Sequence, residues 1–471
     1  MPPACKHSKI QIEVAEQAEF EPSYKRPYYA QRLVATYQVK QRFLGVPTGP
    51  SIQKAHASVF PAPLVLPDDL LDFDEDEKND HQNLYSYLRA TYRKPPTSRK
   101  KTIYVAQVPD ISPEVSQIKE WITPKPPGRV TKKNLKATPP RAEDVCDYLR
   151  AFYYPLPVKL LPETVAFVPW TDTGKNKDKY VGLQIGNGVT RIRTRPTKDK
   201  VFTRQLQLND ILDAAIAALP SDAHSLVMLV DHDTYEDEED DFCCGRAYGG
   251  SRVCMVSSAR YHPALDAMAK IDRSHMWPAS HCKAYVEKMC GWEKNKATKK
   301  RKLEVISEDA STAEPGTPMR AAVDTMMAEG LRPEDDLDGL WYSRVARTVS
   351  HELGHCFQLA HCGYYACVMQ GTAGVAEDVR QPPYLCEVCG LKVYHALKGV
   401  RRDVDQDERE DEIERYKVLL EFCDGKWGKV GMFAGFRGWL EQRIARSLRG
   451  VLSEEGKVFL AERENKKQRL E

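Results

Sequence analysis

Apolar and polar positions repeat with helical and strand periods along the middle of the chain, and these periods predict its elements. Residues 141–154 are typical of a helix with an acidic first turn. In residues 206–222 the apolar positions fall on one helical stripe, and Pro220 ends the predicted helix. Residues 180–195 alternate on both sides of a Gly-Asn-Gly, which favours a hairpin. Residues 225–233 begin with an apolar run that predicts a buried strand.

A second hairpin and a long helix follow. Residues 242–248 and 251–261 are strand-like segments separated by two glycines. The long helix begins with the proline and acids of 332–339, the end at which negative charge is favourable. Four apolar residues one turn apart are expected to face the core: Trp341, Val345, Val349 and Leu353. Two more helical stretches are predicted at 410–422 and 439–452. This order predicts an α+β fold with a twisted mixed sheet covered by helices.

Composition divides the chain into five segments. Residues 1–140 are rich in proline, charge and aromatic residues without a sustained period, which predicts a low-order N-terminal extension. Residues 141–274 are expected to form an N-terminal α/β subdomain. Residues 275–335 are a low-complexity insertion, whose basic run KNKATKKRK is either a solvated loop or a nuclear-import signal. Residues 336–452 hold the long helix and a helical C-terminal subdomain, and 453–471 form a charged tail.

Charge and cysteine usage narrow the class of protein. The chain has 69 basic and 67 acidic residues, so it has no overall field for binding nucleic acid. No apolar run is long enough for a membrane helix, and the N-terminus has no signal core. The 13 cysteines are an odd number and cluster with histidines, which favours reduced, metal-binding thiols. We therefore expect an intracellular protein, cytoplasmic or nuclear.

The densest chemistry lies in residues 350–389, at the end of the long predicted helix. His351 and His355 are four residues apart, so a helix puts both imidazoles on one face, where both can bind one zinc ion. Glu352 points into the same space without being needed as a ligand. It can take a proton from a zinc-bound water and return it to a leaving amine. The spacing therefore predicts a catalytic zinc site with Glu352 as general base.

A third histidine, His361, completes the predicted site. A straight helix would carry it too far along the axis, so the chain has to turn sharply near Gln358. Three histidines and one open position are the ligand count of a catalytic zinc. The alternative, three histidines satisfied within the core, requires three coincidences of spacing.

Four cysteines form a second cluster: Cys362, Cys367, Cys386 and Cys389. Four thiolates saturate a tetrahedral zinc and leave no open position, so this site is expected to be structural. Two disulfides are the main alternative. Cys356 lies beside His355 but on another helix face, and we interpret it as a packed thiol.

The spacing HExxHxxxxxHC, the Cys367-Val-Met369 segment and the later CxxC resemble the archaemetzincins, a branch of the metzincin zinc peptidases with the signature HExxHxxGxxHCx4CxMx17CxxC. The resemblance implies a metzincin-like zincin fold and two zinc ions, one catalytic and one structural. It implies that the three histidines hold the catalytic zinc, that the four cysteines hold the structural zinc and that Glu352 is the general base. It also implies that Met369 is the Met-turn methionine under the metal. Weaker similarity extends over 142–452.

The chain departs from this signature at two points. Gln358 stands where the family has glycine, and a non-glycine residue with positive φ there costs about 1 kcal/mol. Sixteen residues instead of seventeen separate Met369 from Cys386, which a loop accommodates because the cysteines need only converge in space.

In metzincins an extended peptide lies along an edge strand above the active-site helix. One strand of the hairpin 242–258 is our candidate for that edge, and the alternative is an internal hairpin. The acidic loop 236–241 either favours basic substrate residues or is merely solvated.

Two functions remain after these observations. The first is a zinc metallopeptidase acting on a peptide or protein substrate. The second is a catalytically impaired zinc-binding interaction module of the same fold, which Gln358 favours and an intact Glu352 opposes. A zinc-ribbon module would use the four cysteines alone and leaves the histidines unexplained.

Overall fold

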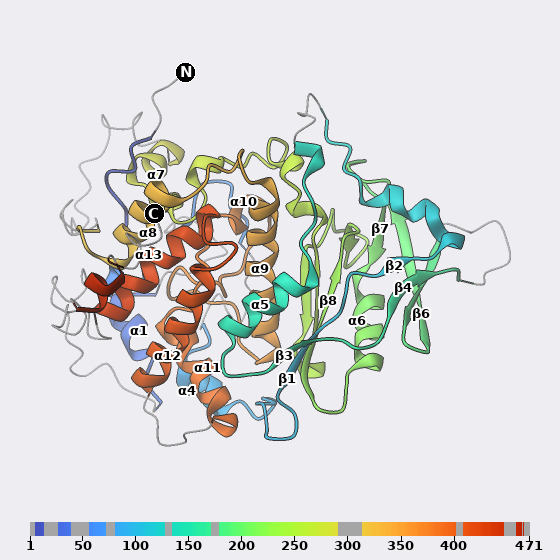
Figure 1. Cartoon of the computed structure of the whole chain (residues 1–471), viewed down its shortest axis with the longest axis horizontal. Coiled ribbons are helices and arrows are strands. Elements are labelled where there is room, and N and C mark those ends of the chain that lie inside the picture. The colour runs from blue at the N-terminus through green and yellow to red at the C-terminus, as the bar shows by residue number, and fades with distance from the viewer. Residues whose placement is uncertain are drawn as a thin grey trace.

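The computed structural model describes residues 5–13, 27–38, 56–71, 81–127, 134–170, 179–290, 313–401, 408–446, 458–463 and 465. Within these ranges the chain is a mixed α/β protein with two mixed sheets. The helix α9 (Leu337–Cys356) stands between the sheets and most of the other long helices (Figure 1).

One sheet has five strands in the order β10-β11-β8-β1-β3. Their bounds are Gly245–Tyr248, Val253–Ser257, Ala223–Val230, Thr102–Val105 and Val158–Leu160. All neighbours pair in parallel except β10, which pairs antiparallel with β11 and lies at the edge. The hairpin expected at 242–258 is therefore confirmed, and one of its strands is an edge strand.

A second sheet has six strands in the order β2-β4-β5-β6-β7-β9. Their bounds are Asp110–Ile111, Val165–Val168, Tyr180–Ile185, Gly188–Pro196, Arg204–Gln207 and Thr234–Tyr235. The hairpin expected at 180–195 is confirmed as β5 and β6, with Gly186 at φ +56° in the turn. The expectation of a single sheet is therefore wrong. The strands β2 and β9 have two residues each, which is too short to show a period in the sequence.

The centre of the five-stranded sheet is buried on both faces. Along β8, Val227 and Leu229 join the core around α9, whereas Leu226 and Met228 join a core shared with α6 (Leu208–Ala218) and the second sheet. Alternate side chains of a strand point to opposite faces, so every residue of β8 is buried. This packing fixes the sheet against which α9 lies.

Several predicted helices are confirmed, including those at 141–154, 206–222 and 410–422. Besides α6 and α9, the α-helices are α1 (Tyr29–Val34), α4 (Leu84–Arg89), α5 (Ala142–Phe152), α7 (Lys283–Met289), α8 (Pro318–Glu329), α10 (Val375–Asp378), α11 (Glu387–Leu397), α12 (Glu408–Cys423) and α13 (Gly431–Ala445). The longest 3-10 helix is η2 (Pro113–Ile122). The helix expected at 439–452 begins earlier, as α13.

The expectation of a low-order extension over 1–140 is wrong for the strand β1, which lies between β8 and β3. This four-residue apolar segment is too short to reveal a period beside the basic residues that precede it. Within 275–335, α8 packs on α13 so closely that a Cβ at Gly438 would meet the backbone oxygen of Ala321. The basic run 294–302 and the acidic run 72–80 lie outside the described residues.

The helices in the described ranges include none that is long and apolar enough to cross a membrane.

Candidate active site

The helix α9 carries the first part of the site. Its N-terminus is capped by Asp336, whose carboxylate accepts a hydrogen bond of 2.8 Å from the Gly339 backbone N–H. The apolar ladder from Trp341 to Leu353 is buried, as its four-residue step predicts. With this stripe fixed in the core, the last two turns present His351, Glu352 and His355 to a cavity on the other side.

A tight turn ends α9 and reverses the chain. Gln358 has φ +66°, the left-handed conformation expected at the position where the archaemetzincins have glycine. Gln82, from the N-terminal part of the chain, makes two hydrogen bonds to the backbone of this turn. Its Nε2 donates to the Gln358 carbonyl at 3.1 Å, and its Oε1 accepts from the Ala360 N–H at 3.2 Å. The Tyr87 hydroxyl donates to the Phe357 carbonyl at 3.0 Å.

This turn brings His361 back to the histidines of α9. One ring nitrogen from each of His351, His355 and His361 lies within 4.8 Å of the other two. The Nδ1 of His351 is 2.6 Å from the Val368 carbonyl oxygen, and the Nδ1 of His355 is 2.7 Å from the Leu359 carbonyl oxygen. Since a carbonyl only accepts, both Nδ1 atoms donate, and this selects the tautomers with unprotonated Nε2.

The two Nε2 atoms of His351 and His355 lie 3.1 Å apart. With both Nδ1 atoms protonated, these are two lone pairs facing each other, an arrangement that a cation between them stabilises. In a tetrahedral zinc site with Zn–N bonds of about 2.0–2.1 Å, neighbouring nitrogens are about 3.3–3.4 Å apart. The donor set therefore fits a zinc ion.

Burial keeps these imidazoles neutral. Burial, followed by the neighbouring His361, lowers the pKa of His351 to about 4. Burial, followed by His351 and His361, holds the pKa of His355 well below its usual range. Neutral imidazole is the form that binds zinc, so the site is in its ligand form near neutral pH.

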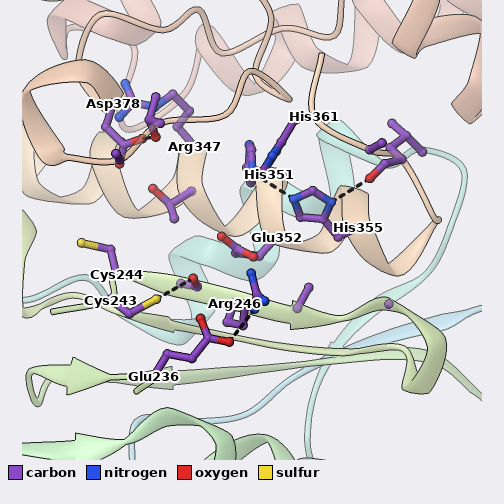
Figure 2. A pocket seen from close by; sticks show the side chains of 18 of the residues that line it. Glu236, Cys243, Cys244, Arg246, Arg347, His351, Glu352, His355, His361 and Asp378 are labelled. Atoms are coloured by element: carbon purple, nitrogen blue, oxygen red, sulfur yellow. Dashed lines mark hydrogen bonds and ion pairs between the residues drawn. The ribbon is translucent and has the colours of Figure 1, made fainter. Parts of the chain in front are cut away.

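Glu352 lies between the helix and the edge strand β10. A Cβ added at Gly245 would lie 2.8 Å from Oε1 of Glu352, so a larger residue there would displace the carboxylate from its position. Figure 2 shows Glu352 pointing toward β10, below the three histidines. The motif itself gives no signal for Gly245, because the two residues lie on separate elements.

Met369 lies beneath α9. Its sulfur occupies the space that a side chain at Gly354 would need. The Met369 carbonyl accepts from the Cys362 N–H at 2.7 Å, which ties this loop to the segment after His361.

The four cysteines converge in a second, fully buried cluster. All four Sγ atoms lie within 4.8 Å of one another, and those of Cys362 and Cys386 are 3.6 Å apart. An S–S bond is about 2.05 Å, and all four thiols are free, so the disulfide alternative is not the arrangement found. The backbone N–H of Cys386 donates to Cys367 Sγ at 3.2 Å. Buried Lys392 lies close enough to favour a negatively charged thiolate cluster.

The histidines open into a cavity of about 660 Å³ that is also lined by β10 and the turn after it (Figure 2). Arg347 lines it one helical turn before His351, and its buried Nη2 has no hydrogen-bond partner among the described residues. Burial lowers the pKa of Arg347, and the neighbouring Asp378 opposes this shift. The Asp378 carboxylate accepts from the hydroxyls of Thr372 and Tyr261. The HExxH spacing carries no signal for Arg347 or Asp378.

The acidic loop 236–241 contributes Glu236 and Asp240 to the cavity wall. Arg246 pairs with Glu236 at 2.9 Å, and Arg195 donates to the carbonyls of Asp237 and Asp240. The loop is therefore held by arginines, and the charge of Glu236 is balanced within the protein.

Cys356 is fully buried, in agreement with its interpretation as a packed thiol.

Comparisons with known proteins agree with this geometry. The sequence model of peptidase family M54 matches residues 326–408, which include both ligand clusters. Archaemetzincin-2 of Homo sapiens is 24% identical over 343 residues, 73% of this chain and 69% of its own length. The archaemetzincin of Thermococcus kodakarensis is 38% identical over 74 residues, 15% of this chain and 40% of its own.

Among solved structures, the archaemetzincin of Methanopyrus kandleri aligns with 64% of this chain and 98% of its own, at a TM-score of 0.30 and 16% identity. The M54 match and the curated relatives bear out the resemblance carried by the histidine and cysteine spacing. The chain is therefore similar to the archaemetzincins, and its residues 326–408 match peptidase family M54.

Proposed function

We propose that this chain is a metzincin-type zinc metallopeptidase that hydrolyses peptide bonds with a zinc-activated water and Glu352 as general base. The observation that carries the proposal is the position of Glu352. Its carboxylate lies between three converging imidazoles and the edge strand β10. A purely structural metal site does not need a carboxylate there.

In this proposal His351, His355 and His361 hold the catalytic zinc. A zinc ion bound by three neutral imidazoles and one open position lowers the pKa of its water to about 7. The carbonyls of Val368 and Leu359 hold the rings of His351 and His355 with Nε2 facing the site. Such second-layer contacts fix the tautomer and orientation of metal ligands.

Glu352 acts as the proton carrier. Its carboxylate takes a proton from the attacking water and gives it to the nitrogen of the departing amine. Burial against β10 restricts its rotation, since Gly245 leaves only enough room for the carboxylate itself. The geometry therefore supports a positioned base.

The edge strand β10 is the proposed substrate platform. Among the described strands it pairs with β11 alone, so its other side can accept an extended peptide by strand addition, although the Gly245 carbonyl also accepts from the Cys243 thiol at 3.2 Å. The strand lines the same cavity as the histidines. A peptide added antiparallel or parallel to β10 would pass over Glu352.

The four cysteines are proposed to hold a second, structural zinc. Thiolates supply all four ligands of a tetrahedral ion and leave no position for water. The loop between Cys367 and Cys386 carries Met369, so this site would hold the Met-turn methionine under the catalytic histidines.

The alternative, a catalytically impaired interaction module, drew its support from Gln358. The left-handed backbone at Gln358 favours the peptidase, and so do the hydrogen bonds of Gln82 to the Gln358 carbonyl and the Ala360 N–H, because they bring His361 to the other ligands despite the missing glycine. The intact Glu352 favours it as well.

The test compares wild type with Glu352→Gln on a broad peptide library, with zinc content measured in both. Peptide hydrolysis is expected to fall about 10²–10⁴-fold while zinc stays at about two ions per chain in these two sites. Glu334→Gln, at an exposed position away from the cavity, is the matched control and is expected to keep full activity. Equal hydrolysis by wild type and Glu352→Gln would favour the interaction module.

A further inference from the structure

The N-terminal segment 5–13 lies alongside residues 281–283 and is far from the active-site residues in sequence. The backbone N–H of Gln11 donates to the His281 carbonyl at 2.8 Å, and that of Lys283 donates to the Lys9 carbonyl at 2.9 Å. In Figure 1 this dark blue segment passes beside α7. The pairing brings Cys5 and Cys282, 277 residues apart, to an Sγ–Sγ distance of 3.2 Å.

A histidine completes a three-residue cluster with these thiols. The ring of His275 stacks on Tyr285, with centroids 4.2 Å apart and planes within 8°. Its Nδ1 is 2.8 Å from the Asp272 carboxylate, which only accepts when ionised, so Nδ1 carries the proton. The unprotonated Nε2 is buried without a hydrogen-bond partner in the part of the chain that the structure describes. One ring nitrogen of His275 lies within 4.8 Å of both sulfurs.

His7 lies beside this cluster but is not one of the residues whose donor atoms all lie within 4.8 Å of one another. Its Nε2 is 3.1 Å from the Ser274 carbonyl oxygen, so Nε2 donates and Nδ1 keeps its lone pair. Nδ1 of His7 is also buried with no partner among the described residues. The rings of His7 and His275 are 5.1 Å apart between centroids. Neither lone pair has a hydrogen-bond partner among the described residues, and His275 lies beside the two thiols.

We propose that Cys5, His275 and Cys282 bind a third metal ion of the zinc class. Two thiolates and one imidazole supply three of the four positions of a tetrahedral zinc ion. The Asp272–His275 pair has the carboxylate–histidine arrangement that orients metal-binding imidazoles. The ion would give the His275 imidazole a partner and tie the N-terminal segment to the start of α7.

A disulfide between Cys5 and Cys282 is the competing outcome. It would require the sulfurs to approach from 3.2 Å to about 2.05 Å. It would leave the Nε2 of His275 buried without a partner among the described residues. The metal accounts for the thiols and the His275 imidazole together, whereas the disulfide accounts for the thiols alone.

This site shares no residue with the two clusters near α9, so its test is independent of peptidase activity. The full-length chain is purified under reducing conditions, and its zinc content is measured by mass spectrometry. Wild type is expected to hold about three zinc ions per chain, and Cys5→Ser and His275→Gln about two. Cys290→Ser, at the end of α7 and outside the cluster, is the matched control and keeps about three.

Cobalt substitution provides a second readout, because it reports thiolate ligands directly. Cobalt-loaded wild type has six cysteine ligands in this proposal, four in the Cys362 cluster and two in the new site. Its thiolate-to-cobalt charge-transfer absorption is expected to exceed that of Cys5→Ser by about the contribution of two of these six thiolates. Equal zinc content in wild type and Cys5→Ser would overturn the proposal. A Cys5–Cys282 cross-link found in the wild type without a third metal would overturn it as well.

Discussion

The turn after α9 depends on a residue from the N-terminal part of the chain, and this dependence can be tested by Gln82→Met. The substitution keeps the length of the side chain and removes its amide. Two hydrogen bonds to the turn are lost, from Nε2 to the Gln358 carbonyl and from the Ala360 N–H to Oε1. Lys392 also loses its 2.9 Å bond to Oε1, although it keeps the Gln82 carbonyl.

The cost follows from these contacts. Each hydrogen bond contributes about 1 kcal/mol, and a polar group left buried without a partner costs about 1–3 kcal/mol. Three lost bonds therefore destabilise the folded state by about 3 kcal/mol or more. The loss also makes the position of His361 less fixed, because the backbone N–H that loses its partner belongs to Ala360, the residue before His361. Loss of such second-layer contacts weakens metal binding or activity about 10–100-fold.

The assay is competition between the protein and a chelator of known zinc affinity, combined with kcat/KM on a peptide substrate. Gln184→Met is the matched control, because its amide also donates to a backbone carbonyl, that of Gly186, on a hairpin away from the site. Gln82→Met is expected to lose zinc at lower chelator concentration and to have lower kcat/KM. If the two variants behave alike, the turn does not depend on Gln82 and the reasoning is refuted.

Three further predictions test other contacts. Gln358→Gly removes the cost of a left-handed non-glycine residue and is expected to raise the free energy of unfolding by up to about 1 kcal/mol in urea denaturation; a loss of stability would contradict this. Gly245→Ala puts a methyl group 2.8 Å from the Glu352 carboxylate and is expected to lower kcat while zinc content stays the same; unchanged kcat would contradict the proposed position of the base. Burial raises the pKa of Glu377 to about 7, so the folded protein binds this proton more tightly than the unfolded chain, and stability is lost as pH rises from about 4.5 to about 7. The loss is at most about 3 kcal/mol; Glu377→Gln is expected to reduce this slope, and parallel pH profiles of urea unfolding would contradict the assignment.

The sequence predicted those parts of the site that depend on local geometry. Helical spacing brings His351 and His355 to one face, and the four-residue apolar step buries the opposite stripe of α9. The sharp turn at Gln358 followed from the need to return His361 to the metal, and the positive φ agrees with it. In each case residues within a few turns of one another decide the outcome.

Contacts between segments that are far apart in the sequence were not predicted. Gln82 is 276 residues from Gln358, and no period in the sequence connects them. The same holds for Gly245, which is recognisable as functional only when β10 passes over Glu352. The strand β1 is a short segment whose role comes entirely from its parallel partners β3 and β8. Pairing of this kind is decided by the whole fold, so residues 1–140 were wrongly expected to be a low-order extension throughout.

Anomalous diffraction at the zinc edge, from crystals of the full-length protein, tests the central claim most directly. The proposed peptidase site requires a zinc peak about 2.0–2.1 Å from a ring nitrogen of each of His351, His355 and His361, with Glu352 close by but not bound. A second peak is expected about 2.3 Å from all four sulfurs of Cys362, Cys367, Cys386 and Cys389. A metal at the histidine cluster that lacks His361, or one that takes Glu352 as a ligand, would contradict the account.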